Sequence, residues 1–322
     1  MKKLLFLLTV LTAPVWCAAQ ETEPLILLNS GRETFINFPS QTWSGKTVTF
    51  FLPQQATPLT GRYPVVYVLG AIPKNAPLAQ AFMDVTPHKA LVVGINFTPE
   101  EMADAARVVR FFKRELIPYV DTNYPTLADA AHRAVAAQGT EGGLAAYALL
   151  YQPELFTKAL LAEPDPALLH ASYLPKNIRL AAWGDRSVLS ALQARLENAG
   201  LAYGTNFVLR EGEPANLFEE LPMAYWLAAA EKVALRRVRA AVSPARLALS
   251  GGVAHLQATA QLANGRIYDF YPSALRISPP YLDYNAPQGT LSVISGAEPA
   301  TVKISGGAGK TAYSAKIKLK KQ

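Results

Sequence analysis

The segment Arg133–Phe156, RAVAAQGTEGGLAAYALLYQPELF, limits the possible folds more than any other part of the chain. It opens with the short apolar run Arg133–Ala137, which suits a buried parallel strand. The glycine-bearing turn Gln138–Gly143 follows, and Leu144–Leu150 then favours a helix. A second strand is predicted at Lys158–Ala162. A strand, a sharp turn, a helix and another strand in this order predict a parallel sheet covered by helices.

Neighbouring segments extend the same pattern. Val65–Leu69 and Ala90–Ile95 are apolar runs with the length of a buried strand. Thr98 can cap the helix that follows, with Pro99 at its first position and Glu101 completing a capping box. The sequence therefore predicts an α/β fold with a doubly wound, mostly parallel sheet. Its other expected elements are strands at Thr47–Pro53, Ile178–Trp183 and Phe207–Leu209 and helices at Thr98–Tyr119, Val188–Ala199 and Pro222–Arg239.

The pattern changes after Pro244, where helical periodicity gives way to short alternating runs. In Tyr313–Leu319, apolar residues alternate with lysines, as in a strand with one buried face. Short strands at this spacing predict a smaller all-β sandwich domain. We expect it to cover 242–322, after an α/β domain over 20–241, with an exposed linker within Ala240–Leu247.

The N-terminus has the three parts of a secretory signal peptide. Lys2 and Lys3 are basic, and Leu4–Val15 is apolar but too short to span a bilayer. Cys17-Ala18-Ala19 is a small-residue cleavage site. We therefore expect residues 1–19 to be removed and the protein to be exported to the periplasm, the cell surface or the medium. A lipoprotein carrying its lipid on Cys17 is the alternative, although Trp16 is larger than the residue such signals place there.

The cysteine content and the net charge limit the possible disulfides and partners. Cys17 is the only cysteine, so the mature chain can form no internal disulfide. The formal net charge of +7 falls to +5 when Lys2 and Lys3 are removed. Outside a cell, such an excess favours anionic envelope polymers over nucleic acid as partners, although solvated surface lysines without a partner are a simpler explanation than either. Much of it comes from Arg236, Arg237, Arg239, Lys310, Lys316, Lys318, Lys320 and Lys321.

Two parts of the chain resemble known families. Glu115–Arg133, ELIPYVDTNYPTLADAAHR, and the segment that follows resemble the putative esterases of the α/β-hydrolase class, which include esterase D and the enterochelin esterases. Those proteins read ELIPYID-NY, then RAIAG-x-S-x-GG, then HP-LF. The resemblance implies a nucleophile elbow, a strained strand-to-helix turn that exposes a catalytic serine. Less specifically, QLANGRIYDFYPSALRIS and the strands after it resemble bacterial Ig-like adhesin modules.

The elbow motif has lost its serine in this chain. Aligned without gaps, the serine position falls on Gly139, and the flanking glycines fall on Ala137 and Glu141. A shift of one residue would place Thr140 there instead. That shift needs an insertion and a compensating deletion, and it puts a β-branched residue into a strained backbone. Because glycine adopts such a conformation freely, we expect an elbow kept as a turn and lost as a catalyst.

The resemblance also implies positions for the other catalytic groups. Asp185, in WGDRS, lies about where the family has its acid, although a helix-capping aspartate is the simpler explanation. Backbone amides of Gly70, Ala71 and Thr140 would correspond to the oxyanion hole. The family's histidine belongs in Arg210–Trp226, which contains none. The four histidines of the chain lie elsewhere, at His88, His132, His170 and His255.

Ligands of open α/β sheets bind at the C-terminal edge of the parallel strands. Acidic residues are predicted to gather near this edge, either as ligand-binding groups or as solvated loop residues. The candidates are Glu141, Glu163, Asp165, Glu211 and Glu213. We expect no cofactor and no metal, since the sequence has no metal-ligand spacing, phosphate loop or dinucleotide fingerprint.

Three functions follow from these observations. The first is a non-catalytic binding or cell-envelope protein whose partner is a small ligand, a glycan or an envelope protein. The second is a carboxylic-ester hydrolase that uses Thr140 or a triad of another arrangement. The third is an adhesive or surface-sorted protein that acts through its C-terminal β domain. The missing serine and histidine favour the first function over the second.

The signal peptide generates the first prediction. We expect the native protein to begin at or near Gln20, because the cleavage site precedes that residue. N-terminal sequencing and intact mass of the native protein measure this directly. A chain that retains residues 1–19 would contradict export, and a diacylglyceryl mass on Cys17 would establish the lipoprotein.

Overall fold

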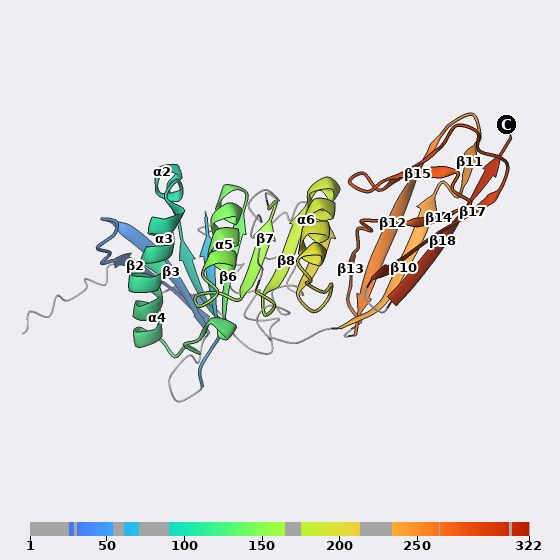
Figure 1. Ribbon diagram of the computed structural model, residues 1–322. Coiled ribbons are helices and arrows are strands. Elements are labelled where there is room, and N and C mark those ends of the chain that lie inside the picture. Colours follow the sequence, from blue (N-terminus) through green and yellow to red (C-terminus); the bar gives the residue numbers. More distant parts are fainter. Residues whose placement is uncertain are drawn as a thin grey trace, which may run out of the picture.

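A computed structural model shows an α/β part followed by an all-β part (Figure 1). It describes residues 26–28, 31–53, 61–70, 90–164, 175–212, 234–263, 265–308 and 311–321. The expected signal peptide and the expected oxyanion loop after Gly70 lie outside these residues. In the described part of the chain, no helix is both long and apolar enough to cross a membrane.

The sheet of the α/β part has the predicted parallel core. The order of its strands is β1-β2-β3-β5-β4-β6-β7-β8-β9. The strands from β5 to β9 are parallel, whereas β1, β2 and β3 are antiparallel. This is an α/β-hydrolase-type fold, and the expected fold class is confirmed. The strands are β1 (Ile26–Leu28), β2 (Gly31–Phe38), β3 (Lys46–Pro53), β4 (Val65–Leu69), β5 (Leu91–Ile95), β6 (Arg133–Gln138), β7 (Lys158–Ala162), β8 (Arg179–Gly184) and β9 (Phe207–Glu211).

The helix expected over Thr98–Tyr119 is broken into pieces. Thr98 and Glu101 form the predicted capping box at the start of α2 (Pro99–Met102), and Asp104 caps a new helix, α3 (Ala105–Phe111). A π-helical turn, η1 (Phe112–Leu116), then leads into α4 (Ile117–Asn123). The widened turn ends two residues before Pro118, which cannot donate to the carbonyl four residues earlier.

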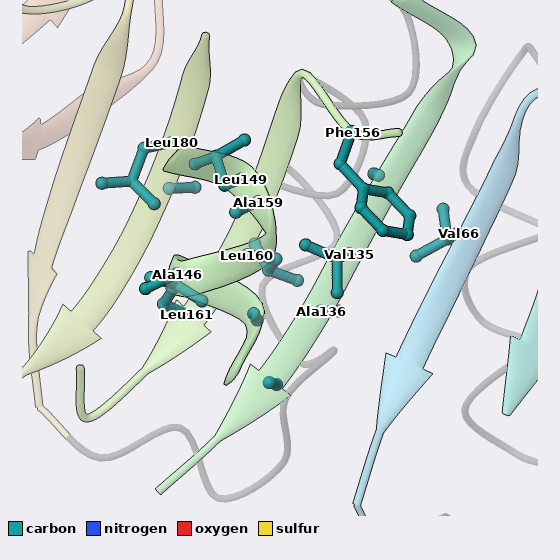
Figure 2. Close-up of a cluster of buried hydrophobic side chains, with 14 of the residues drawn as sticks. Val66, Val135, Ala136, Ala146, Leu149, Phe156, Ala159, Leu160, Leu161 and Leu180 are labelled. Carbon is teal, nitrogen blue, oxygen red and sulfur yellow. The ribbon is translucent and has the colours of Figure 1, made fainter. Parts of the chain in front are cut away.

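Helix α5 (Thr140–Tyr151) covers the centre of the sheet. Its buried side chains lie in the same apolar cluster as those of the strands beneath it, including Val66 of β4, Val135 of β6 and Leu160 of β7 (Figure 2). Gly142 lies over β7, where an added methyl group would make an ordinary contact with the carbonyl oxygen of Ala162 at 3.7 Å.

The C-terminal part is all-β, as predicted. The sheet β13-β12-β16-β15, with β10 on β12, faces a four-stranded sheet in the order β11-β18-β17-β14. Both contribute to one core of Leu247, Ala254, Leu256, Leu282, Leu291, Val302, Ile304, Ile317 and Leu319. The Ig-like topology stays a prediction. The strands are β10 (Leu235–Ser243), β11 (Arg246–Ala248), β12 (Val253–Leu262), β13 (Ile267–Asp269), β14 (Arg276–Ser278), β15 (Leu282–Asn285), β16 (Thr290–Val293), β17 (Thr301–Ala308) and β18 (Thr311–Lys320).

The helix expected over Pro222–Arg239 is wrong for its last residues. Leu235–Arg239 belong to β10, which pairs with β12 along its whole length. Val238, Ala240 and Val242 alternate towards the interior, so strand pairing overrides the local helical pattern. The expected linker Ala240–Leu247 is likewise taken up by β10 and β11. The division at 241 falls within β10, and the two-domain organisation itself stays a prediction.

The α/β part and the β part share a sheet and a core. Asp269 of β13 pairs with Leu209 of β9, so one sheet continues from the first part into the second. Helix α6 (Arg186–Asn198) lies beside this junction (Figure 1). Its fully buried Gln193 accepts a hydrogen bond from the Tyr271 amide at 2.9 Å. The β part is therefore held by directional bonds as well as by apolar contacts.

Candidate functional site

Gly139 makes the turn between β6 and α5 in a single residue. Its φ of +59° and ψ of −127° lie in a region that side-chain-bearing residues rarely adopt. Its amide donates to the carbonyl of Ala162 at 3.0 Å, and its own carbonyl accepts from the Gly142 amide at 3.0 Å. The turn is thus fixed on one side to β7 and on the other to the first turn of α5.

The helix begins earlier than expected. The turn predicted over Gln138–Gly143 contracts to Gly139, and Thr140 is already the first residue of α5. Glu141 lies in the first helical turn, where a carboxylate interacts favourably with the helix dipole. The backbone therefore places Gly139, and not Thr140, at the sharp point of the elbow.

The backbone amide of Gly70 does not have the role expected for it in an oxyanion hole. The amide of this residue donates to the Ile95 carbonyl at 3.1 Å, which extends the pairing of β4 with β5. It is therefore not available to a developing negative charge. Ala71 lies outside the described residues. Thr140 is at the first position of a helix, where amides have no intrahelical acceptor.

Three of the candidate acids follow neighbouring strands. Glu163 comes directly after β7, Asp185 after β8, and Glu211 is the last residue of β9; all three are exposed. Strand register aligns these ends, since Gly184 pairs with Glu211 and Ala162 with Trp183. The three carboxylates thus lie along one edge of the sheet, on the side of the elbow.

The other candidate acids differ in placement. Glu141 is half-buried, and its side chain packs against Gly70, where an added methyl group would lie 3.4 Å from Cδ. Asp165 and Glu213 lie outside the described residues. Asp185 precedes α6 but makes no capping hydrogen bond with its side chain, so the simple capping explanation does not account for it.

Glu163 has an unusual backbone. Its φ is +54°, the only positive φ at a non-glycine position in the described ranges. Its amide donates to the Trp183 carbonyl at 2.8 Å, and Gly184 in turn lies close to the Glu163 Cα, at 3.6 Å from an added methyl group. The side chain is consequently projected from a tightly held backbone beside the elbow.

Arg186 is a functional candidate that the sequence did not reveal. Its Nη2 donates to the Leu256 carbonyl at 2.7 Å, and its guanidinium lies 5.3 Å from the Tyr271 ring centre. Its Nη1 also lies 3.7 Å from Oε2 of Glu211. Through Arg186, Glu211 therefore lies next to the junction between the α/β part and the β part. No local sequence signal could show this, because the arginine and Leu256 are far apart in the chain.

The two described histidines lie away from the elbow. His132 is at the opposite end of β6, and Nδ1 is 2.8 Å from Asp129 Oδ1. With a rise of about 3.3 Å per residue, it lies roughly 20 Å from Gly139. His255 is exposed on β12, opposite Ser243 and Thr290. His88 and His170 lie outside the described residues.

Among the residues that the structure describes, no group of three or more His, Cys, Asp or Glu side chains is arranged to hold a metal. The carboxylates along the sheet edge are spread over successive strands instead. Their arrangement suits hydrogen bonding to a polar ligand better than enclosure of an ion.

Comparison with known proteins found similarity only among solved structures. No protein-family model matches the sequence, and no curated protein matches it. A ferulic acid esterase is 14% identical, with a TM-score of 0.47, over 63% of this chain and 98% of the other. A ferric enterobactin esterase from Salmonella typhimurium is 19% identical, with a TM-score of 0.49, over 62% of this chain and 59% of the other. An S-formylglutathione hydrolase from Staphylococcus aureus is 13% identical, with a TM-score of 0.45, over 63% and 99%.

The elbow backbone generates the second prediction. Gly139→Ala should lower the free energy of unfolding by about 1–3 kcal/mol, because alanine must adopt a strained φ there. Steric contact does not add to this, since no atom lies within 4 Å of the added methyl group. Urea denaturation measures the change.

Gly142→Ala is the matched control. That glycine lies in α5 with ordinary contacts, so alanine should leave stability unchanged or raise it by up to about 1 kcal/mol. Equal effects of the two substitutions would show that the elbow conformation is not held as described.

Proposed function

We propose that the protein is an exported, non-catalytic binding protein built on an esterase-like α/β-hydrolase fold. The observation that carries the proposal is Gly139 at the elbow. Its backbone has the positive φ of a strained strand-to-helix turn, but no side chain extends from it. The proposed export depends on the N-terminal segment Met1–Ala19.

The chemistry of acyl transfer supports the same proposal. A hydroxyl nucleophile needs a base within hydrogen-bond reach to take its proton. His132 lies at the far end of β6, and His255 belongs to the β part. Loss of the serine or its base in a serine hydrolase lowers kcat by about 10⁶-fold. Backbone amides alone leave only about 10³-fold acceleration over water.

The edge that carries Glu163 and Asp185 is the proposed ligand-binding side of the α/β part. Ligands of open α/β sheets occupy this edge, and both carboxylates are exposed there. Exposed carboxylates can accept hydrogen bonds from sugar hydroxyls, from amines or from backbone amides of a partner. Glycans, small polar ligands and envelope proteins are the partner classes that this chemistry fits.

The third prediction is that the purified mature protein does not hydrolyse simple esters above background. Turnover of p-nitrophenyl acetate and butyrate measures this, with Thr140→Ala and Asp185→Ala assayed in parallel. The control variant is Gly139→Ser, which restores a hydroxyl at the elbow but not the base. We expect all four proteins to be equally inactive.

Two outcomes would contradict the proposal. Wild-type turnover that Thr140→Ala abolishes would identify the protein as a hydrolase with a threonine nucleophile. Strong activity gained by Gly139→Ser alone would reveal a base already positioned at the elbow, and the site would then be a catalytic one lacking only its nucleophile.

A further inference from the structure

The positive charge of the chain is concentrated in the β part. Residues 235–322 hold 12 of the 31 Lys and Arg residues but only three of the 24 Asp and Glu residues, a net charge of +9. The preceding 234 residues therefore carry a net charge of −2. The basic excess of this protein is thus a property of its last nine strands.

Six of these cations lie on one surface. Strands β11, β14, β17 and β18 alternate strictly, so that Leu247, Ile304 and Leu319 enter the core while the residues between them face solvent. No acidic residue occurs on any of the four strands. We call this surface the basic face; its cations are Arg246, Arg276, Lys303, Lys316, Lys318 and Lys320.

Strand pairing arranges these cations as a grid. Arg246 of β11 is opposite Lys318 of β18, and Lys316 of β18 is opposite Lys303 of β17. Neighbouring strands are about 4.8 Å apart, and alternate residues of one strand about 6.7 Å apart. The basic face therefore presents positive charges at short, regular intervals in two directions.

This arrangement does not serve the stability of the sheet. Like charges directly opposite each other on two strands are destabilising, and Lys303 faces Lys316 in this way. None of the six cations forms an ion pair with another part of the described chain. Lysines often protect exposed sheet edges, but β17 and β18 are the two inner strands of this sheet. Within the described residues the face therefore stays without compensating charge, as a surface that binds an anionic partner would.

A groove of about 440 Å³ opens at one end of the basic face. Arg276 and Lys303 line it together with the hydroxyl-bearing Ser305 and Ser314. The phenol of Tyr313 lies where a side chain at position 306 would be, so Gly306 leaves room for this ring. The groove thus combines cations with hydroxyls, next to the largely buried ring of Tyr313.

We propose that the basic face binds a linear acidic polysaccharide whose carboxylates meet the cations. Ser305, Ser314 and Thr301 lie between the cations in the strand register and can bind sugar hydroxyls. Single-stranded nucleic acid fits less well, because the exposed residues of the face include no aromatic side chain for base stacking. A membrane fits less well because the exposed large apolar residues Val253, Ile267 and Ile294 are not on this sheet. The basic face is separate from the elbow, so the proposal holds whether or not the elbow is catalytic.

The test uses the full mature chain and polygalacturonate as the probe, with neutral dextran as the uncharged control. We expect saturable binding to polygalacturonate that weakens as salt rises, and none to dextran. The triple variant Arg276→Gln/Lys303→Gln/Lys316→Gln should weaken binding at least about 10-fold, because it removes half of the six cations, one from each of three neighbouring strands.

The matched control removes the same charge elsewhere. Arg110→Gln/Arg114→Gln/Lys176→Gln neutralises three exposed cations of the α/β part and should change affinity less than about 2-fold. Thermal unfolding of both triple variants checks folding. The basic-face variant should melt at the same or a higher temperature, since it removes opposed like charges.

Several results would overturn the proposal. Equal losses in the two triple variants would mean that net charge alone is responsible. Tighter binding to duplex DNA or to anionic phospholipid vesicles than to polygalacturonate at equal ionic strength would assign the face to another partner. Absence of binding to polygalacturonate at low salt would refute it directly.

Discussion

The single-residue turn at Gly139 is the constraint on which the α/β part depends. It ends β6, starts α5 and hydrogen-bonds to β7, so three elements of the sheet's centre meet at one backbone position. Only a residue that tolerates positive φ can make this connection without strain. Glycine satisfies that requirement without offering a nucleophile. The sharp strand-to-helix turn is thus formed without a side chain at its apex.

The parts of the fold that could be predicted are those set by residues close together in the sequence. Apolar runs such as Val65–Leu69 identified the buried strands, and Thr98 with Glu101 identified a helix start, because both depend on residues close in sequence. The prediction of a helix up to Arg239 was wrong for its last residues, because β12, the strand that pairs with this segment, comes later in the chain. Arg186 was missed for the same reason. Its partners at Leu256 and Tyr271 are brought to it only by the fold.

The β part shows the same limit for a binding surface. The sequence shows the alternating lysines of β18, but it does not show whether they form a binding surface, since a single basic strand is usually a solvated edge strand. In the structure, β18 pairs with β17, and this pairing places Lys303 opposite Lys316, so that the cations cover a two-dimensional surface. The α/β part, which is joined to the β part through Gln193 and β13, contributes the acidic edge at Glu163 and Asp185. The molecule thus carries two exposed surfaces of opposite charge on two different sheets, the acidic edge on the larger sheet and the basic face on the four-stranded sheet.

Labelling with a fluorophosphonate probe tests the central claim most directly, because such a probe phosphonylates an activated hydroxyl whatever its natural substrate. Intact mass of the mature protein after incubation, with a known serine hydrolase as a positive control, provides the measurement. The account predicts an unchanged mass, since Gly139 has no hydroxyl and neither described histidine lies near it. An adduct mapped by peptide mass to Thr140, or to any serine at the C-terminal edge of the sheet, would contradict it.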